Sequence, residues 1–325
     1  MCTAITFSTK DNYFGRTLDW IESYGEKVVV TPRNYPFKFR KCQNIDNHYA
    51  IIGMAVISDN YPLYYDGTNE KGLSMAGLNF PDNAHYENEV TDKDNVPPFE
   101  FIPWILCQCA TVEEARNKLS NINIIDMPFN QDFKLSPLHW IISDKTESIT
   151  IEPLKEGIRI YDNSVGVLTN NPTFDMQLLN LNNYMNLSSK EPVNNFSDRL
   201  DLKPYSYGMG AIGLPGDLSS MSRFVRAVFT KYNSVSEKSE CDSISQFFHI
   251  MSQVSQTRGC TVVEDEKYEI TLYTSCCNTD KGIYYYTTYG NSQITAIDMH
   301  RENIDGSQLI SHELVRGQQV LMMRG

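Results

Sequence analysis

The sequence contains no run of about 18 consecutive apolar residues, so it predicts no transmembrane helix and no membrane insertion. It also lacks a basic segment followed by a long apolar stretch, which is the pattern of a secretory signal. No internal repeat, low-complexity tract or Pro-, Gly- or Ser-rich linker is visible in the 325 residues. We therefore expect a single domain over residues 1–325, located in the cytoplasm.

Positive charge is also scarce. The chain has 28 Lys and Arg against 40 Asp and Glu, which gives a net charge of −12, and no run of basic residues exceeds two. A nucleic-acid-binding protein would normally carry a basic stripe, so we expect no nucleic-acid partner. An anionic substrate would be repelled at long range, although salt screens that repulsion beyond roughly 8 Å. Such a substrate would need basic side chains at the site itself.

Metal-binding patterns are missing as well. The eight cysteines and six histidines form neither a C-x-x-C pair nor an H-E-x-x-H motif. The adjacent Cys276 and Cys277 and the closely spaced Cys107 and Cys109 do not have zinc-site spacing. We expect no metal, no cofactor and mostly reduced, packed cysteines.

The apolar pattern predicts strands near both ends of the chain and helices between them. Segments rich in Ile, Val, Thr and Tyr predict strands at residues 3–8, 14–18, 27–31, 49–57, 73–78, 139–143, 148–152, 158–161, 166–169, 269–275, 283–288 and 293–298. Capping boxes at Thr111-Val-Glu-Glu114 and Ser243-Ile-Ser-Gln246 predict two helices, and a third follows Ser219-Ser220. Strands grouped apart from helices indicate an α+β fold.

Cysteine at position 2 suggests a reactive centre. If Met1 is trimmed, Cys2 supplies both a thiol nucleophile and an α-amine that can accept the thiol proton. The alternative is that Cys2 is only a small residue that begins a strand. A hairpin across residues 10–12 would bring Arg16 and Asp19 close to Cys2. There an Arg would favour the thiolate and a carboxylate would hold an α-ammonium, whereas a solvated ion pair would contribute little.

Over essentially its whole length the sequence closely resembles the bile salt hydrolases (choloylglycine hydrolases), which belong to the N-terminal nucleophile hydrolase superfamily. The stretches that carry the resemblance are Met1-Cys-Thr-Ala-Ile-Thr6, Phe14-Gly-Arg-Thr-Leu-Asp19, Asn69-Glu-Lys-Gly-Leu73, Ala76-Gly-Leu-Asn-Phe80, Leu168-Thr-Asn-Asn-Pro-Thr-Phe174, Gly213-Leu-Pro-Gly-Asp217 and Ser222-Arg-Phe224. The resemblance implies a four-layer αββα sandwich with two antiparallel sheets between helical layers.

The resemblance also implies a catalytic set. The positions that match the family's functional residues are Cys2, Arg16, Asp19, Asn79, Asn170 and Arg223. In this interpretation Asn79 donates to the developing oxyanion. Asn170 orients the amine or holds the tetrahedral intermediate, Arg16 and Arg223 keep the thiol deprotonated, and Asp19 holds the N-terminal amine.

The same resemblance implies an apolar pocket for the steroid. It maps onto Leu18 and onto the loop from Phe129 through Phe133 to Leu138, which is either a mobile hydrophobic lid or a set of core residues beneath a long loop. Related penicillin V acylases tend to carry Tyr where this chain has Asn79, so Asn79 favours bile salts as substrates. Trp20 and the segment Tyr205-Ser-Tyr-Gly208, where relatives often have Arg before the Gly, depart from the family pattern and bear on substrate preference and subunit contacts.

The expected activity is hydrolysis of glycine- and taurine-conjugated bile salts through a Cys2 thioester, with amine acyl transfer as a side activity. The resemblance also implies a homotetramer. The alternatives are a penicillin V acylase, a non-catalytic bile-acid-binding protein that retains Met1, and a Cys–His hydrolase that uses His139 as its base.

Overall fold

The computed structural model describes residues 1–264 and 266–323, so the last two residues of the expected domain 1–325 lie outside the described part. The strands are β1 (Cys2–Ser8), β2 (Asn12–Trp20), β3 (Lys27–Thr31), β4 (Ile51–Ser58), β5 (Tyr61–Asn69), β6 (Ser74–Asn79), β7 (Asp94–Val96), β8 (Ile122–Ile124), β9 (Leu138–Ser143), β10 (Ser148–Leu154), β11 (Gly157–Asp162), β12 (Val167–Leu168), β13 (Ile270–Asn278), β14 (Ile283–Thr288), β15 (Asn291–Asp298) and β16 (Ile310–Glu313). The helices are α1 (Pro98–Leu106), α2 (Val112–Leu119), α3 (Phe174–Leu181), α4 (Ser220–Asn233) and α5 (Glu240–Ser252).

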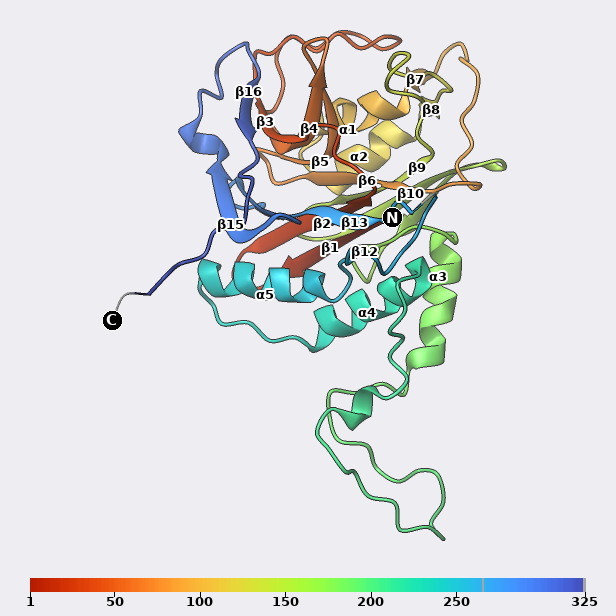
Figure 1. Ribbon diagram of the computed structural model, residues 1–325. Coiled ribbons are helices and arrows are strands. Elements are labelled where there is room, and N and C mark those ends of the chain that lie inside the picture. Colours follow the sequence, from red (N-terminus) through yellow and green to blue (C-terminus); the bar gives the residue numbers. More distant parts are fainter. Residues whose placement is uncertain (265, 324–325) are drawn as a thin grey trace.

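Two large antiparallel sheets form the centre of the protein. One has six strands in the order β12-β1-β2-β13-β14-β15, and the other has eight in the order β11-β10-β9-β6-β5-β4-β3-β16. In Figure 1, α4 and α5 cover the six-stranded sheet from below, whereas α1 and α2 lie on the far side of the eight-stranded sheet. The expected four-layer αββα sandwich is confirmed.

The strand alternation explains why the eight-stranded sheet is buried on both faces. Along β6, Ala76 and Leu78 join the core that the two sheets share, whereas Met75 joins the core beneath α1 and α2. In β9, Ile141 faces the shared core and Trp140 faces the helical side. Successive side chains of a strand point to opposite faces, so an apolar run fills both cores.

The predicted hairpin between the first two strands is confirmed, with Cys2 opposite Leu18, Ala4 opposite Arg16 and Ser8 opposite Asn12. The capping box that begins α2 is also confirmed in part, because the Thr111 hydroxyl accepts from the Glu114 amide at 3.2 Å. The Glu114 carboxylate accepts from the amide of Ala110 rather than from that of Thr111.

The predicted capping box that starts at Ser243 is wrong. Helix α5 begins four residues earlier, where the Ser239 hydroxyl accepts from the Asp242 amide at 3.1 Å. Ser243 lies in the second turn, and its hydroxyl donates to the Ser239 carbonyl at 2.9 Å. Both serines have the sequence spacing of a cap, and only the chain path decides which of them has extended backbone.

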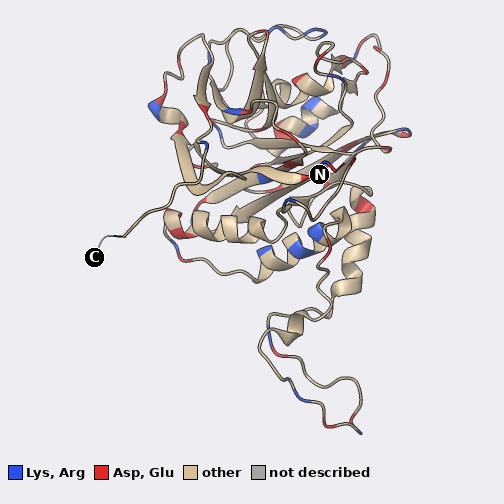
Figure 2. Ribbon diagram, viewed as in Figure 1, with Lys and Arg blue, Asp and Glu red and all other residues tan. Residues whose placement is uncertain are grey.

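No helix in residues 1–264 and 266–323 is long and apolar enough to span a membrane. Lys and Arg are spread over the helices, strands and loops, interspersed with Asp and Glu (Figure 2).

Candidate active site

The β1–β2 hairpin of the six-stranded sheet places Arg16 against Cys2. Because Ala4 pairs with Arg16 and Cys2 with Leu18, the side chains of Cys2, Arg16 and Leu18 lie on one face of the β1–β2 hairpin. The Arg16 Nη2 atom donates to Cys2 Sγ at 2.5 Å. Both side chains are buried, so their electrostatic attraction is poorly screened. This arrangement places a fixed positive charge directly beside the Cys2 sulfur.

Backbone carbonyls fix the Arg16 side chain. Its Nε donates to the Thr17 carbonyl at 3.0 Å, and its Nη1 donates to the carbonyls of Tyr65 and Gly77 at 3.2 and 2.5 Å. Although burial alone lowers the pKa of Arg16, nearby negative groups, with Cys2 first among them, raise that pKa above its ordinary value. Arg16 therefore stays charged, and most of its hydrogen-bonding capacity is committed.

Asn170 lies opposite Cys2 because β12 pairs with β1. Ala4 pairs with Leu168, and continuing this antiparallel register two residues places Asn170 beside Cys2. The Asn170 Oδ1 atom accepts from the Cys2 nitrogen at 2.8 Å, and its Nδ2 donates to the Asn79 carbonyl at 2.6 Å. Asn170 thus joins the nucleophile strand to the end of β6 in the other sheet.

Arg223 contacts the backbone of Cys2 from the first turn of α4. Its Nη1 donates to the Cys2 carbonyl at 2.5 Å and to the Thr3 hydroxyl at 2.6 Å. Its Nη2 donates to Asn170 Oδ1 at 2.7 Å. The expectation was that Arg223 acts on the Cys2 thiol. Its hydrogen bonds instead go to the Cys2 carbonyl and to the Asn170 carboxamide, which orient the Cys2 backbone.

Met1 extends β1 and pairs with Asp19. The Asp19 amide donates to the Met1 carbonyl at 2.9 Å, and the Met1 ammonium donates to the Asp19 carbonyl at 2.7 Å. The same ammonium forms an ion pair with the buried Glu269 carboxylate. The Asp19 carboxylate instead accepts from the hydroxyls of Thr17 and Thr271, at 3.2 and 2.6 Å. With Met1 in place, Glu269 rather than the Asp19 carboxylate is the carboxylate that pairs with the chain's amine.

Burial raises the pKa of Asp19 above its ordinary value, and the positive charges of Arg223 and the chain terminus oppose that shift. Burial lowers the pKa of Arg223, and Asp19 opposes that shift in turn. The two groups are therefore electrostatically coupled to each other.

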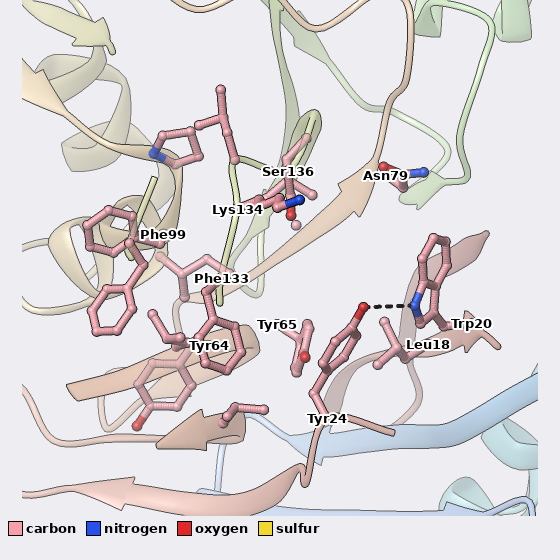
Figure 3. A pocket seen from close by; sticks show the side chains of 18 of the residues that line it. Leu18, Trp20, Tyr24, Tyr64, Tyr65, Asn79, Phe99, Phe133, Lys134 and Ser136 are labelled. Atoms are coloured by element: carbon pink, nitrogen blue, oxygen red, sulfur yellow. Dashed lines mark hydrogen bonds between the residues drawn. The ribbon is translucent and has the colours of Figure 1, made fainter. Parts of the chain in front are cut away.

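A cavity of about 380 Å³ opens beside this cluster. Ligand cavities in proteins usually measure about 300–1,000 Å³ and are mostly apolar with a few polar groups. Cys2, Arg16, Asp19 and Asn79 contribute to its wall, and the rest of the wall is largely aromatic or aliphatic. Figure 3 shows Asn79 on one side of the cavity and the rings of Phe99, Tyr64 and Phe133 on the other.

All four residues expected to contact an apolar substrate line this cavity, namely Leu18, Phe129, Phe133 and Leu138. Phe129 is buried and packs edge-on against Phe99 and Phe133, with ring centroids 5.2 and 6.2 Å apart. The guanidinium of Arg40 lies 5.1 Å from the Phe129 ring centroid. Phe129 therefore anchors the loop in an aromatic cluster, whereas Phe133 is half-buried at the cavity wall.

Trp20, a departure from the family pattern, also lines the cavity. Its indole Nε1 donates to the Tyr24 hydroxyl at 3.2 Å, and the Tyr24 ring lies 6.4 Å from that of Phe133 (Figure 3). Trp20 thus supports the loop that carries Phe133.

The family profile described as linear amide C–N hydrolases, choloylglycine hydrolase family, matches residues 2–312. This chain belongs to the choloylglycine hydrolase family. It is 56% identical to the bile salt hydrolase/transferase of Lactiplantibacillus plantarum over 314 residues, which cover 97% of each protein. The structure of the C2A mutant of the conjugated bile acid hydrolase from Clostridium perfringens matches with a TM-score of 0.92 and 39% identity over 100% of both chains. A penicillin V acylase from Agrobacterium tumefaciens shares the fold, with a TM-score of 0.76 at 20% identity over 97% of this chain and 92% of its own.

His139 is engaged elsewhere in this choloylglycine hydrolase family member. Its Nδ1 lies 3.1 Å from a Glu152 carboxylate oxygen and its Nε2 lies 2.9 Å from the Thr169 carbonyl. The ring is fully buried and stacks on Phe80 with centroids 4.2 Å apart. Both ring nitrogens face oxygen acceptors, so neither is free to take a proton from a thiol. This geometry disfavours the Cys–His alternative.

Several residues near the family's nucleophile position were not found from the sequence. Asp66 accepts hydroxyl hydrogen bonds from Tyr273 at 2.8 Å and Tyr284 at 2.6 Å, and it is a negative neighbour of Arg16. Burial raises the pKa of Asp66, and Arg16 opposes that shift. Glu269 and Asp66 carry no local motif, so only their placement in space links them to Cys2.

Close packing between strands requires glycine at position 15, which the sequence motif alone does not show. A Cβ at this position would lie 2.0 Å from the Ser275 carbonyl oxygen of β13. The glycine therefore lets β2 and β13 approach closely next to Arg16.

In residues 1–264 and 266–323, no three His, Cys, Asp or Glu side chains are grouped so that they could hold a metal ion.

Proposed function

We propose that this protein hydrolyses the amide bond of glycine- and taurine-conjugated bile salts. The observation that carries the proposal is the Arg16–Cys2 contact of 2.5 Å at the wall of an apolar cavity of about 380 Å³. A thiolate needs a fixed cation beside it, and a steroid amide needs an apolar enclosure next to that thiolate. Family membership and the bile salt hydrolase names of the relatives support the same activity.

The reaction begins once Met1 has been removed and the Cys2 nitrogen is the free α-amine. The Cys2 thiolate attacks the amide carbon, and the carbonyl π electrons move onto oxygen. The Asn79 carboxamide, at the cavity wall, donates to that oxyanion as its charge develops. Asn170 Oδ1 accepts from the Cys2 nitrogen at 2.8 Å and so fixes the amine for proton transfer.

Collapse of the tetrahedral intermediate breaks the C–N bond. The protonated Cys2 amine gives its proton to the departing nitrogen, so glycine or taurine leaves as an amine and a thioester remains on Cys2. A water molecule then gives its proton to the Cys2 amine and attacks the thioester, which releases the bile acid and the thiolate. If an amine attacks in place of water, a new conjugate forms, so acyl transfer is a side activity.

The test is a direct comparison of three substrates. Purified protein is incubated with glycocholate, taurocholate and penicillin V, and the released amine is measured in each case. We expect release from both bile salts at a higher kcat/KM than from penicillin V. A clear preference for penicillin V would overturn the choice of substrate, and no release by fully processed protein would overturn the activity.

A bile-acid-binding protein without activity is the rival class. It would retain Met1, whose ammonium is paired with Glu269. Intact mass spectrometry distinguishes the two classes, because the enzyme requires the loss of one methionine. Full retention of Met1 together with bile-acid binding would favour the rival.

We also propose a cytoplasmic homotetramer. The segment between α3 and α4 projects away from the sheets in Figure 1 and carries exposed apolar side chains. Phe196, Tyr205 and Tyr207 are 81%, 84% and 93% exposed. Such a surface on a projecting segment is typical of a contact with another subunit. Light scattering should give the mass of four chains, and a monomer at micromolar concentration would contradict the proposal.

A further inference from the structure

We propose that Lys134 binds the anionic end of the substrate, the glycine carboxylate or the taurine sulfonate. This inference rests on the function proposed above and assigns a specificity-determining residue to it. The protein carries a net charge of −12, so an anionic conjugate needs a local cation to offset the overall repulsion.

The cavity wall offers two basic side chains among the described residues, Arg16 and Lys134. Arg16 is fully buried and already donates to Cys2 Sγ and to three backbone carbonyls. Lys134 is exposed and makes no hydrogen bond or ion pair with the described part of the chain. Its ammonium is therefore the cation that remains available to a bound anion.

Hydrogen bonds hold the loop on both sides of Lys134. On one side, Asn130 Oδ1 accepts from the amides of Asp132 and Phe133 at 3.0 and 2.8 Å. On the other side, the Tyr86 hydroxyl donates to the Ser136 carbonyl and accepts from the Leu138 amide, both at 2.7 Å. The backbone is thus placed, whereas the lysine side chain keeps its freedom to reach a ligand.

The register places this loop beside the expected reaction centre. Leu138 pairs with Asn79, and the Phe80 amide donates to the Pro137 carbonyl at 2.8 Å, so the chain from Lys134 enters β9 beside the end of β6 that carries Asn79. In Figure 3 the Lys134 side chain lies between the aromatic side of the cavity and Asn79. A conjugate whose scissile carbonyl meets Asn79 has its anion only a few bonds beyond that carbonyl.

Two acidic side chains also line the cavity. The Asp19 carboxylate is buried and accepts from two threonine hydroxyls, whereas Asp132 is exposed on the same loop as Lys134. Asp132 would repel the anion, which makes the Lys134 charge more important for binding.

The test compares Lys134→Gln, Lys134→Glu and Lys134→Arg on glycocholate and on its neutral primary amide, which has the same scissile bond. For glycocholate we expect kcat/KM to fall about fivefold in Lys134→Gln and roughly 25-fold in Lys134→Glu, mainly through KM. Lys134→Arg should stay near the wild-type value. The neutral amide should be hydrolysed equally by all four proteins. Lys145→Gln, at an exposed turn away from the cavity, is the matched control and should leave kcat/KM unchanged for both substrates.

Ionic strength supplies a second measurement. Raising salt from 0.1 M to 1 M shortens the Debye length from about 10 Å to about 3 Å, so the difference between wild type and Lys134→Gln should shrink. An equal loss on the charged and neutral substrates would overturn the inference, because it would indicate packing against the steroid. Hydrolysis of neither substrate by the wild-type protein would instead refute the function proposed above.

Discussion

Replacement of Asn170 by alanine should reduce kcat strongly while leaving KM nearly unchanged. The Asn170 carboxamide makes three contacts, from the Cys2 nitrogen at 2.8 Å, from Arg223 at 2.7 Å and to the Asn79 carbonyl at 2.6 Å. In the processed enzyme the first contact holds the amine that must take and return the proton. The side chain is expected to act on the reacting amine and not on the steroid.

The size of the effect follows from the two charge-assisted contacts. Loss of a preorganised hydrogen bond to a reacting group costs about 2.7–4 kcal/mol of transition-state stabilisation, which corresponds to roughly 10²- to 10³-fold in kcat. The Asn79 carbonyl also loses its donor, which should lower the free energy of unfolding by about 1–3 kcal/mol. The loss of kcat and the loss of stability can be measured separately, because activity is measured well below the melting temperature, where the variant is still folded.

The assay is release of glycine from glycocholate over a range of concentrations, with intact mass to establish that Met1 has been removed. Asn171→Ala is a matched control, because the neighbouring Asn171 amide donates to the Pro81 carbonyl at 2.7 Å and has no contact with Cys2. We expect the control to keep kcat within about threefold. If processed Asn170→Ala keeps kcat within threefold, or if its loss lies in KM alone, the assignment of Asn170 to the amine is incorrect.

The remaining predictions concern the nucleophile, a buried acid and the rejected base. Cys2→Ala should abolish turnover and Cys2→Ser should nearly do so, because a serine hydroxyl beside Arg16 ionises far less readily; substantial activity of either protein would contradict the thioester route. Burial raises the pKa of Glu100 to about 7, so the native state holds this proton more tightly than the unfolded chain does. The contribution of Glu100 to stability is therefore fully present below about pH 4 and is lost as pH rises to about 7. Glu100→Gln should accordingly raise the free energy of unfolding by about 3 kcal/mol at pH 8 and by little at pH 4, as measured by urea denaturation; an equal change at both pH values would refute this assignment. His139→Gln should keep kcat per folded molecule within about threefold but lower stability by about 1–3 kcal/mol, because buried Glu152 loses the ring and keeps only the Phe174 amide as a hydrogen-bond partner; loss of activity in a fully folded variant would restore the histidine-base alternative.

Local sequence predicted most of the strands because their apolar residues alternate and their ends carry turn residues. It failed for α1, where Pro97 and Pro98 resemble a break in structure, although Pro98 occupies the first helical turn and Pro103 lies inside the helix. Strand β5 also escaped prediction, because Tyr61-Pro-Leu-Tyr-Tyr-Asp66 mixes polar and aromatic residues that are covered only when both faces of the strand are packed in the folded protein. The burial of α1 and of β5 depends on neighbours that are distant in the sequence.

The candidate site was found through short motifs rather than through geometry. Cys2 and Arg16 lie on one hairpin, so their proximity followed from strand pairing alone. The roles of the other matched positions came from resemblance and stay predictions, and two contacts beside them were not expected. Arg223 contacts the Cys2 carbonyl, and Glu269 rather than the Asp19 carboxylate pairs with the Met1 ammonium.

By itself the sequence determined the α+β class and the β1–β2 hairpin and singled out Cys2 as the expected nucleophile, because these depend on local alternation, turn residues and one short motif. Only the tertiary structure decided which carboxylates surround Arg16, which atom of Arg223 meets Cys2, and that the loop with Lys134 borders the same cavity as Asn79. The physical reason is that burial and charge pairing depend on distances between segments far apart along the chain. The packing of the two large sheets and the helices around two cores sets those distances.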